Sequence, residues 1–282
     1  MGYQAVFKRY EIKYMLTREQ KQAVLEAMAP YMIMDKFGRS TIRNIYFDTD
    51  DYILARHSIA KPAFKEKLRI RSYTKADAGS TVFVELKRKY DHVVYKRRLG
   101  MPEEDAMKWM SGAVNDTILS EASAESPQVA AEIGCFLDTY KGLRPAVYLS
   151  YDREAYRMKP GTSMADGGAD FRVTFDENIL ARDYDLSLES DAYGRSLLEE
   201  GKVLMELKCS GGIPLWMVHI LSELRIYKTS FSKYGTAYQT MVFPELSRSY
   251  TKDFVKAPAA ERIPKRYAAP EPVKAGRSYA AV

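Results

Sequence analysis

Between Lys61 and Arg98 the sequence alternates charged and apolar residues with a period of two, in three consecutive runs. The runs read KEKLRIRSY, VFVELKRK and VVYKRR, and they begin at Lys65, Val82 and Val93. In a β-strand, residues two apart in sequence share one face of the sheet. We therefore expect three strands with one charged and one apolar face. Because the apolar face must be buried, the charged face looks either to solvent or into a polar cavity.

The same segment concentrates the positive charge of the chain. It holds twelve Lys or Arg residues against four acids, a charge of +8, whereas the whole chain carries +6, so the remainder carries −2. Concentrated positive charge is typical of proteins that bind polyanions. Charge alone leaves nucleic acid, phospholipid and phosphate compounds open as partners.

Hydrophobic periodicity and turn residues indicate a chain of alternating strand and helix groups. The expected strands lie within residues 6–15, 41–51, 65–98, 146–157, 170–179 and 202–208, and the expected helices within 17–30, 102–110, 126–140, 214–226 and from the FSKYGTAY run onward. This order predicts an α+β fold, a closed antiparallel β-barrel with helices packed outside. We expect residues 1–249 to form this domain. Residues 250–282, rich in Ala, Pro and Lys, are expected to be a disordered basic tail.

The sequence also indicates where such a chain resides. No apolar run approaches the roughly 18–20 residues that span a bilayer. The first residues lack the apolar stretch of a secretory signal. Cys135 and Cys209 have no metal-ligand spacing and suggest no disulfide framework. We therefore expect a soluble cytoplasmic protein without a transmembrane segment.

Several strands place cations and carboxylates opposite their apolar residues. On the expected charged faces lie Glu11 and Lys13; Lys67, Arg69 and Arg71; Glu85 and Lys87; Lys96 and Arg98; Glu206 and Lys208; and Arg172. A single strand of this kind is usually a solvated sheet face. If the sheet closes, however, like charges about 5 Å apart repel by roughly 3 kcal/mol at an effective dielectric near 20, and a polyvalent anion would relieve this.

The residue types narrow the expected ligand. Arg forks suit bidentate contact with phosphate oxygens, and Lys serves as a point charge. Interleaved carboxylates are explained by a divalent metal that bridges carboxylate and phosphate. The pattern therefore favours a tunnel for a triphosphate or a longer phosphate chain with Mn²⁺ or Mg²⁺.

The motifs, taken in order, resemble those of a known family. They are FKRYEIKY, IYFDTDDY, KLRIRSY, VFVELKRK, VYKRR, YLSYDREAY, FRVTFD, VLMELK and FSKY, and they cover about residues 6–240. The chain resembles the polyphosphate polymerase domain of the vacuolar transporter chaperone (VTC) proteins, within the CYTH-like triphosphate tunnel metalloenzymes. The resemblance implies a basic tunnel that binds a nucleoside triphosphate with a metal. It also implies transfer of the γ-phosphate of ATP onto phosphate or polyphosphate, with release of ADP.

Carried over position by position, the resemblance implies roles for individual residues. The expected catalytic residues are Lys13, Arg69, Arg71, Lys87, Lys96, Arg153, Arg172 and Lys233. The expected substrate-binding residues are Glu11, Glu85, Arg98, Tyr151, Lys208 and Ser232. Glu206 is expected to bind the metal. The expected ligands are ATP, inorganic phosphate and polyphosphate, and no nucleic acid is expected.

The sequence departs from the hydrolytic members of the superfamily at one motif. Their Glu-x-Glu-x-Lys signature appears here only as Glu11-x-Lys13, which favours the polymerase branch over thiamine triphosphatases and adenylate cyclases. Three alternatives stay open: hydrolysis of triphosphate or polyphosphate in the same tunnel, a non-catalytic module that binds polyphosphate or nucleotide, and nucleic-acid binding by an open basic sheet. A separate membrane partner that receives the product also stays open.

Overall fold

The computed structural model describes residues 10–60, 62–90, 93–112, 126–161 and 170–247. Met1–Val242 is one compact unit, and Phe243–Val282 is a second, of which residues 243–247 are described and helical. The expected boundary at residue 249 and the expected disordered tail lie outside the described residues. Among the described residues, no helix combines the length and the apolarity that a membrane span requires.

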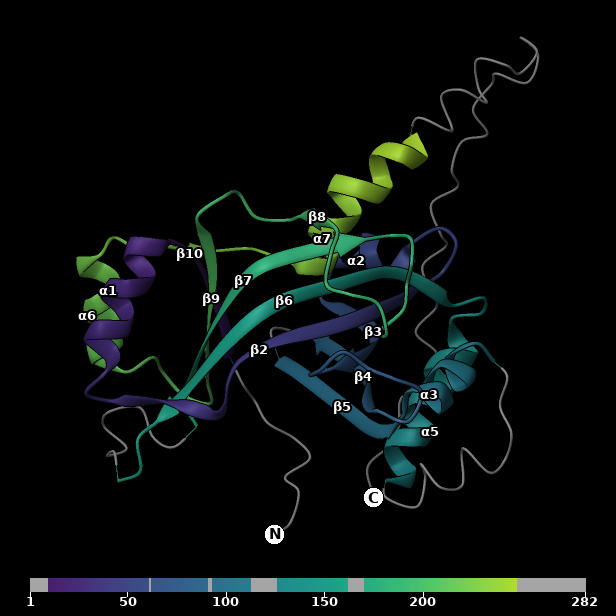
Figure 1. Ribbon diagram of the computed structural model, residues 1–282, viewed down its shortest axis with the longest axis horizontal. Coiled ribbons are helices and arrows are strands. Elements are labelled where there is room, and N and C mark those ends of the chain that lie inside the picture. Colours follow the sequence, from purple (N-terminus) through teal and green to yellow (C-terminus); the bar gives the residue numbers. More distant parts are fainter. Residues whose placement is uncertain (1–9, 61, 91–92, 113–125, 162–169, 248–282) are drawn as a thin grey trace, which may run out of the picture. The chain divides into compact units, whose positions relative to one another are not determined.

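The first unit is built on one antiparallel sheet of ten strands, which differ in length (Figure 1). The strands are β1 (Tyr10–Thr17), β2 (Met32–Asp48), β3 (Phe64–Ser72), β4 (Thr81–Tyr90), β5 (Val93–Pro102), β6 (Arg144–Met158), β7 (Arg172–Arg182), β8 (Arg195–Ser196), β9 (Lys202–Cys209) and β10 (Lys228–Thr229). Their order across the sheet is β10-β1-β9-β7-β6-β2-β3-β4-β5, with β8 paired to β7.

The helices of the first unit include two pairs that pack against the two hydrophobic cores of the sheet. The helices are α1 (Arg18–Met28), α2 (Ile53–Ala60), α3 (Glu103–Met110), α5 (Pro127–Thr139), α6 (Leu215–Glu223) and α7 (Lys233–Ala237), the last continuing into the π-helical turn η2 (Tyr238–Val242). Figure 1 shows α1 with α6 at one part of the sheet and α3 with α5 at another. Each pair covers its own hydrophobic core, around Leu16 and Phe171 in one case and Leu68 and Trp109 in the other.

Local sequence explains where several of these elements begin. Thr17 caps α1 in a capping box, because its side chain accepts from the Gln20 amide while the Gln20 side chain accepts from the Thr17 amide. Pro127 occupies the first turn of α5, where its missing N–H costs nothing. The sequence did not predict the helix α2, because the side chain that accepts hydrogen bonds from its first amides lies several residues before the helix begins. Asp48 accepts from the amides of Leu54 and Ala55, six and seven residues further on.

The expected closed barrel is not observed. Among the described strands, β5 pairs only with β4, and β10 pairs only with β1, so no backbone ladder joins the two ends of the sheet. The physical reason lies in β10, which is two residues long and offers few backbone groups for pairing. The sheet nevertheless curls, as shown by Lys87 of β4, which reaches Glu11 of β1 at 2.7 Å although five strands lie between them in the sheet order. Side-chain contacts, not strand pairing, join the two ends of the sheet, and we call this junction the seam.

Candidate phosphate-binding lumen

The charged faces of the strands turn inward and form a polar lumen. We define its charged lining by ten cations and four carboxylates. The cations are Lys13, Lys67, Arg69, Arg71, Lys87, Lys96, Arg98, Arg153, Lys208 and Lys233, and the carboxylates are Glu11, Glu85, Asp176 and Glu206.

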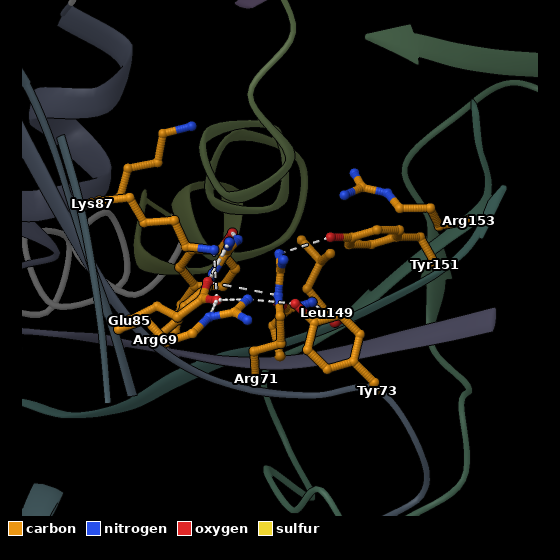
Figure 2. A network of polar contacts seen from close by, with 12 residues as sticks. Arg69, Arg71, Tyr73, Glu85, Lys87, Leu149, Tyr151 and Arg153 are labelled. Atoms are coloured by element: carbon orange, nitrogen blue, oxygen red, sulfur yellow. Dashed lines mark hydrogen bonds and ion pairs between the residues drawn. The ribbon is translucent and has the colours of Figure 1, made fainter. Parts of the chain in front are cut away.

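The first wall of the lumen consists of the inward side chains of β3, β4 and β5. Strand register aligns Arg69, Glu85 and Arg98 in one row across the three strands. The fully buried carboxylate of Glu85 pairs with Arg69 Nη2 at 2.8 Å, Arg98 Nη2 at 2.5 Å and Lys96 Nζ at 2.8 Å. Arg71 Nε lies 3.8 Å away. One carboxylate therefore holds four cations at fixed positions (Figure 2).

The cations of the first wall keep Glu85 ionised. Burial alone would raise the pKa of its carboxyl, but Arg71 and Arg69, followed by Lys96 and Arg98, hold that pKa well below its usual range. The guanidinium of Arg71 makes further hydrogen bonds, with Nε donating to Asn44 Oδ1 and Nη2 donating to the Tyr151 hydroxyl, both at 2.9 Å. Arg69 Nη1 donates to the Tyr46 hydroxyl at 2.8 Å.

The second wall consists of the inward side chains of β1, β6, β7 and β9 together with Ser232 and Lys233 at the start of α7. Asp176 is fully buried and accepts two hydrogen bonds from Arg153, at 2.6 and 2.7 Å, and one from Lys233 Nζ at 2.6 Å. The paired cations outweigh burial and hold the pKa of Asp176 below its usual range. This carboxylate thereby joins the sheet to α7.

Glu206 is the other buried carboxylate of the second wall. It pairs with Lys208 Nζ at 3.1 Å and Lys13 Nζ at 3.8 Å, and Arg153 lies 4.0 Å away. Burial opposes its ionisation, but Lys208 and Lys13 hold the pKa of Glu206 well below its usual range. Burial, together with Lys233 and Lys87, lowers the pKa of Lys13 to about 8 against the attraction of Glu206.

Among the described residues, three polar contacts cross from one wall to the other: Lys87 pairs with Glu11, Arg71 donates to Tyr151, and Lys67 Nζ donates to Ser232 Oγ at 3.0 Å. Within the second wall, Lys13 Nζ donates to a backbone carbonyl just before α7 at 2.8 Å. Figure 2 shows Tyr151 and Arg153 facing the group formed by Arg69, Arg71 and Glu85. The start of α7 therefore lies against the seam between the two ends of the sheet.

Tyr151 lies where the two walls meet. It is 2% exposed, and the Lys233 ammonium and the Arg153 guanidinium lie over its ring, 4.5 and 5.0 Å from the centroid. Burial alone would raise the pKa of its phenol, but Arg153, Arg71 and Lys233 lower it to about 8. The lowered pKa of this phenol is the consequence of an excess of positive charge around it.

Fourteen of the fifteen residues expected at the site line this lumen, and Arg172 lies at its edge on the same face of the sheet, directly opposite Lys208. It is the first residue of β7, two residues before Thr174, where it is exposed and makes no ion pair with the described residues. The roles of the other fourteen stay predictions. The sequence pattern placed Asp176 on the same face as Arg172 but gave it no role, and it likewise left Lys67 out of the expected site.

The carboxylates of the lumen are too few to hold a divalent metal by themselves, so a metal would bind only together with a phosphate group. The described residues contain no group of three or more His, Cys, Asp or Glu side chains arranged for a metal ion. Glu206 is ionised and buried, with Glu11 close enough to influence its charge. Mg²⁺ commonly binds one or two carboxylates and completes its shell with phosphate oxygens and water. The residues present fit such a shared site.

The sequence and the fold are similar to those of known proteins. The model of the VTC domain matches residues 8–242. Among solved structures, a protein from Bacillus halodurans proposed to be an adenylate cyclase is 14% identical with a TM-score of 0.44, and the match covers 80% of this chain and 95% of that one. A Vibrio parahaemolyticus protein with the same proposed activity is 11% identical with a TM-score of 0.42, covering 81% and 96%. No curated protein matches. Because the domain model spans most of the sequence, the chain belongs to the VTC domain family.

Proposed function

We propose that this chain is a metal-dependent polyphosphate polymerase. It transfers the γ-phosphoryl group of ATP onto inorganic phosphate or polyphosphate and releases ADP. The observation that carries the proposal is the convergence of ten cations on one lumen in which only four carboxylates answer them. Membership of the VTC domain family supports a triphosphate-binding fold.

The proposed reaction suits a site without a nucleophilic side chain. The bond between the γ-phosphorus and the β–γ bridging oxygen breaks, and that oxygen leaves with ADP. A new bond forms between the γ-phosphorus and a terminal oxygen of the acceptor phosphate, which is already ionised at neutral pH. Catalysis then consists of positioning and charge neutralisation.

The two walls supply these functions differently. Arg69 and Arg71 of the first wall present planar donor groups that match phosphate oxygens, and Glu85 holds both in place. Arg153 of the second wall, held by Asp176, faces them across the lumen (Figure 2), and Asp176 also holds Lys233. Cations on both sides would lower the repulsion between the acceptor phosphate and the incoming phosphoryl group.

The metal would be held by Glu206, with Glu11 beside it. Bound Mn²⁺ or Mg²⁺ would supply further neutralisation of charge on the phosphate oxygens. All the other groups that we propose to neutralise the phosphate charges are side chains of this protein.

The test is to incubate the protein with ATP and Mn²⁺, to measure ADP, and to run the products on a gel. A polyphosphate ladder with matching ADP is the expected result. Free phosphate without a ladder would indicate hydrolysis in the same lumen. Bound ATP without turnover would indicate a binding module.

Variants tie the result to the lumen. Arg69→Ala removes a lumen cation and should lower turnover by about 10²–10³-fold, the effect of removing one preorganised donor. Arg56→Ala is the matched control, because Arg56 lies on α2, is half exposed and pairs with the exposed Asp51. Equal turnover in the Arg69 and Arg56 variants would contradict the proposed site.

A further inference from the structure

Lys67 occupies a distinctive position in the first wall. Strand register places it directly opposite Lys87, which is itself opposite Lys96, so three lysines form one row across β3, β4 and β5. Side chains directly opposite each other on adjacent strands have Cβ atoms about 4.5–5.5 Å apart, and like charges there are destabilising. Each member of the row therefore needs a compensating partner.

The other two lysines of the row have such a partner. Lys87 pairs with Glu11 at 2.7 Å, and Lys96 pairs with Glu85 at 2.8 Å. Lys67 Nζ instead donates to the neutral hydroxyl of Ser232 at 3.0 Å. Among the ten lumen cations, within the described part of the chain, Lys67 alone has no carboxylate oxygen within 4.0 Å.

The charged groups that act most strongly on Lys67 are cations: Lys13 from β1, Lys87 from β4, and Lys65 and Arg69 from its own strand. The nearby carboxylate of Glu11 is paired with Lys87. Ser232 at the start of α7 accepts the hydrogen bond of Lys67, and Ser58 of α2 lies 3.5 Å from the Ser232 hydroxyl. Burial lowers the pKa of the Lys67 ammonium well below its usual value, and the neighbouring lysines, Lys13 and Lys87 first, lower it further. Without an anion, the geometry therefore favours a neutral amine at this position.

We propose that Lys67 is a phosphate-binding residue of the lumen and that it takes up a proton from solvent when a polyphosphate chain binds. The step is balanced: solvent supplies one proton, Nζ changes from amine to ammonium, and a phosphate oxygen accepts a hydrogen bond from it. The inference rests on the proposed function, because it requires a phosphate chain in the lumen. It adds that phosphate affinity is linked to proton binding and strengthens as the pH falls.

The probe is inorganic tripolyphosphate without metal, titrated into the protein by calorimetry at pH 8. The same titration in two buffers of different ionisation enthalpy gives the number of protons taken up on binding. We compare the wild type with Lys67→Gln, which cannot be charged, and with Lys67→Arg, which is charged at all times. Lys75→Gln is the matched control, since Lys75 is exposed and pairs with the exposed Asp191.

The expected result is proton uptake in the wild type and in Lys75→Gln, and a smaller uptake, by up to about one proton per tripolyphosphate, in both Lys67 variants. Lys67→Arg should still bind tightly, whereas Lys67→Gln should bind at least about tenfold more weakly. Circular dichroism and thermal melting of the free variants confirm that each one folds.

Other outcomes separate this inference from the proposed function. Tight binding with the same proton uptake in Lys67→Gln as in the wild type would overturn the role of Lys67 and leave the polymerase proposal standing. Tight binding without any proton uptake in the wild type would do the same. No binding of metal-free tripolyphosphate to the wild type would overturn the role of Lys67, and no binding after Mn²⁺ is added would overturn the polymerase proposal as well.

Discussion

The two walls of the lumen hold their cations by different arrangements. In the first wall, Glu85 of β4 holds four cations that all come from its neighbours β3 and β5, and these three strands follow one another in sequence and in the sheet. In the second wall, Asp176 joins Arg153 of β6 to Lys233 of α7, a residue 57 positions away. The first arrangement is internal to one antiparallel meander. The second depends on how α7 docks against the sheet.

In the first wall the cations are placed by local strand pairing, whereas in the second wall their placement depends on the assembly of the whole site. The meander of β3 to β5 can set its cations before the rest of the lumen exists, because each pairing is between neighbouring strands. The start of α7 acquires its position only through long-range contacts. Tyr234 contributes to these, because its hydroxyl donates to the buried Asp48 at 2.6 Å and its ring stacks on Tyr46 at 4.6 Å.

The largest expected effect is that of Glu85→Gln. Removing this charge leaves four cations without a counter-ion in a buried row, and we expect a loss of about 4 kcal/mol in the free energy of unfolding. Urea unfolding measures this loss. Tripolyphosphate should restore part of it, because an anion that binds only the folded state stabilises that state. Glu104→Gln, at an exposed pair on α3, is the control and should leave stability unchanged.

The same carboxylate predicts the direction of the acid response. Because the folded state holds the pKa of Glu85 below the ordinary value of 4.5, its stabilisation is present above that pH. It is lost as the pH falls through the lower value in the folded state. Between pH 7 and pH 3 the wild type should therefore lose more stability than Glu85→Gln. A parallel decline of the two proteins in urea unfolding would show that Glu85 is not the group concerned.

A smaller and more local effect is expected for Asp176→Asn. The variant leaves only Arg153 and Lys233 unpaired, and we expect a loss of about 3 kcal/mol. Because Asp176 joins the sheet to α7, hydrogen exchange of the α7 amides should accelerate in this variant and remain slow in Glu85→Gln. Equal acceleration in both variants would remove the distinction between the two walls.

The first wall could be predicted from sequence, because strand period alone decides which side chains share a face. Curvature, and therefore which strands meet across the lumen, depends on twist and on irregularities such as the register shift between Ser150 and Asp152. For this reason the alternation could not tell that the two ends of the sheet stay unpaired among the described strands. Asp176 was visible as a charge on the correct face. Its importance follows from Lys233, which no local pattern connects to it.

Tyr151 gives the smallest effect and the most direct comparison, because it touches both walls. Its phenol should ionise near pH 8, since Arg153, Arg71 and Lys233 outweigh burial. Ultraviolet difference titration against Tyr151→Phe isolates this signal. Lys233→Ala should raise the pKa of Tyr151 to about 9, a change of about 1.4 kcal/mol.

Lys96→Ala, which removes a cation of the first wall that pairs with Glu85, is the matched control and should leave the pKa of Tyr151 near 8. If Lys96→Ala raised it as far as Lys233→Ala does, charge would be shared evenly across the lumen and the two walls would not be distinct. Bound tripolyphosphate should raise the pKa of Tyr151 in the wild type, because it compensates the cations of both walls at once.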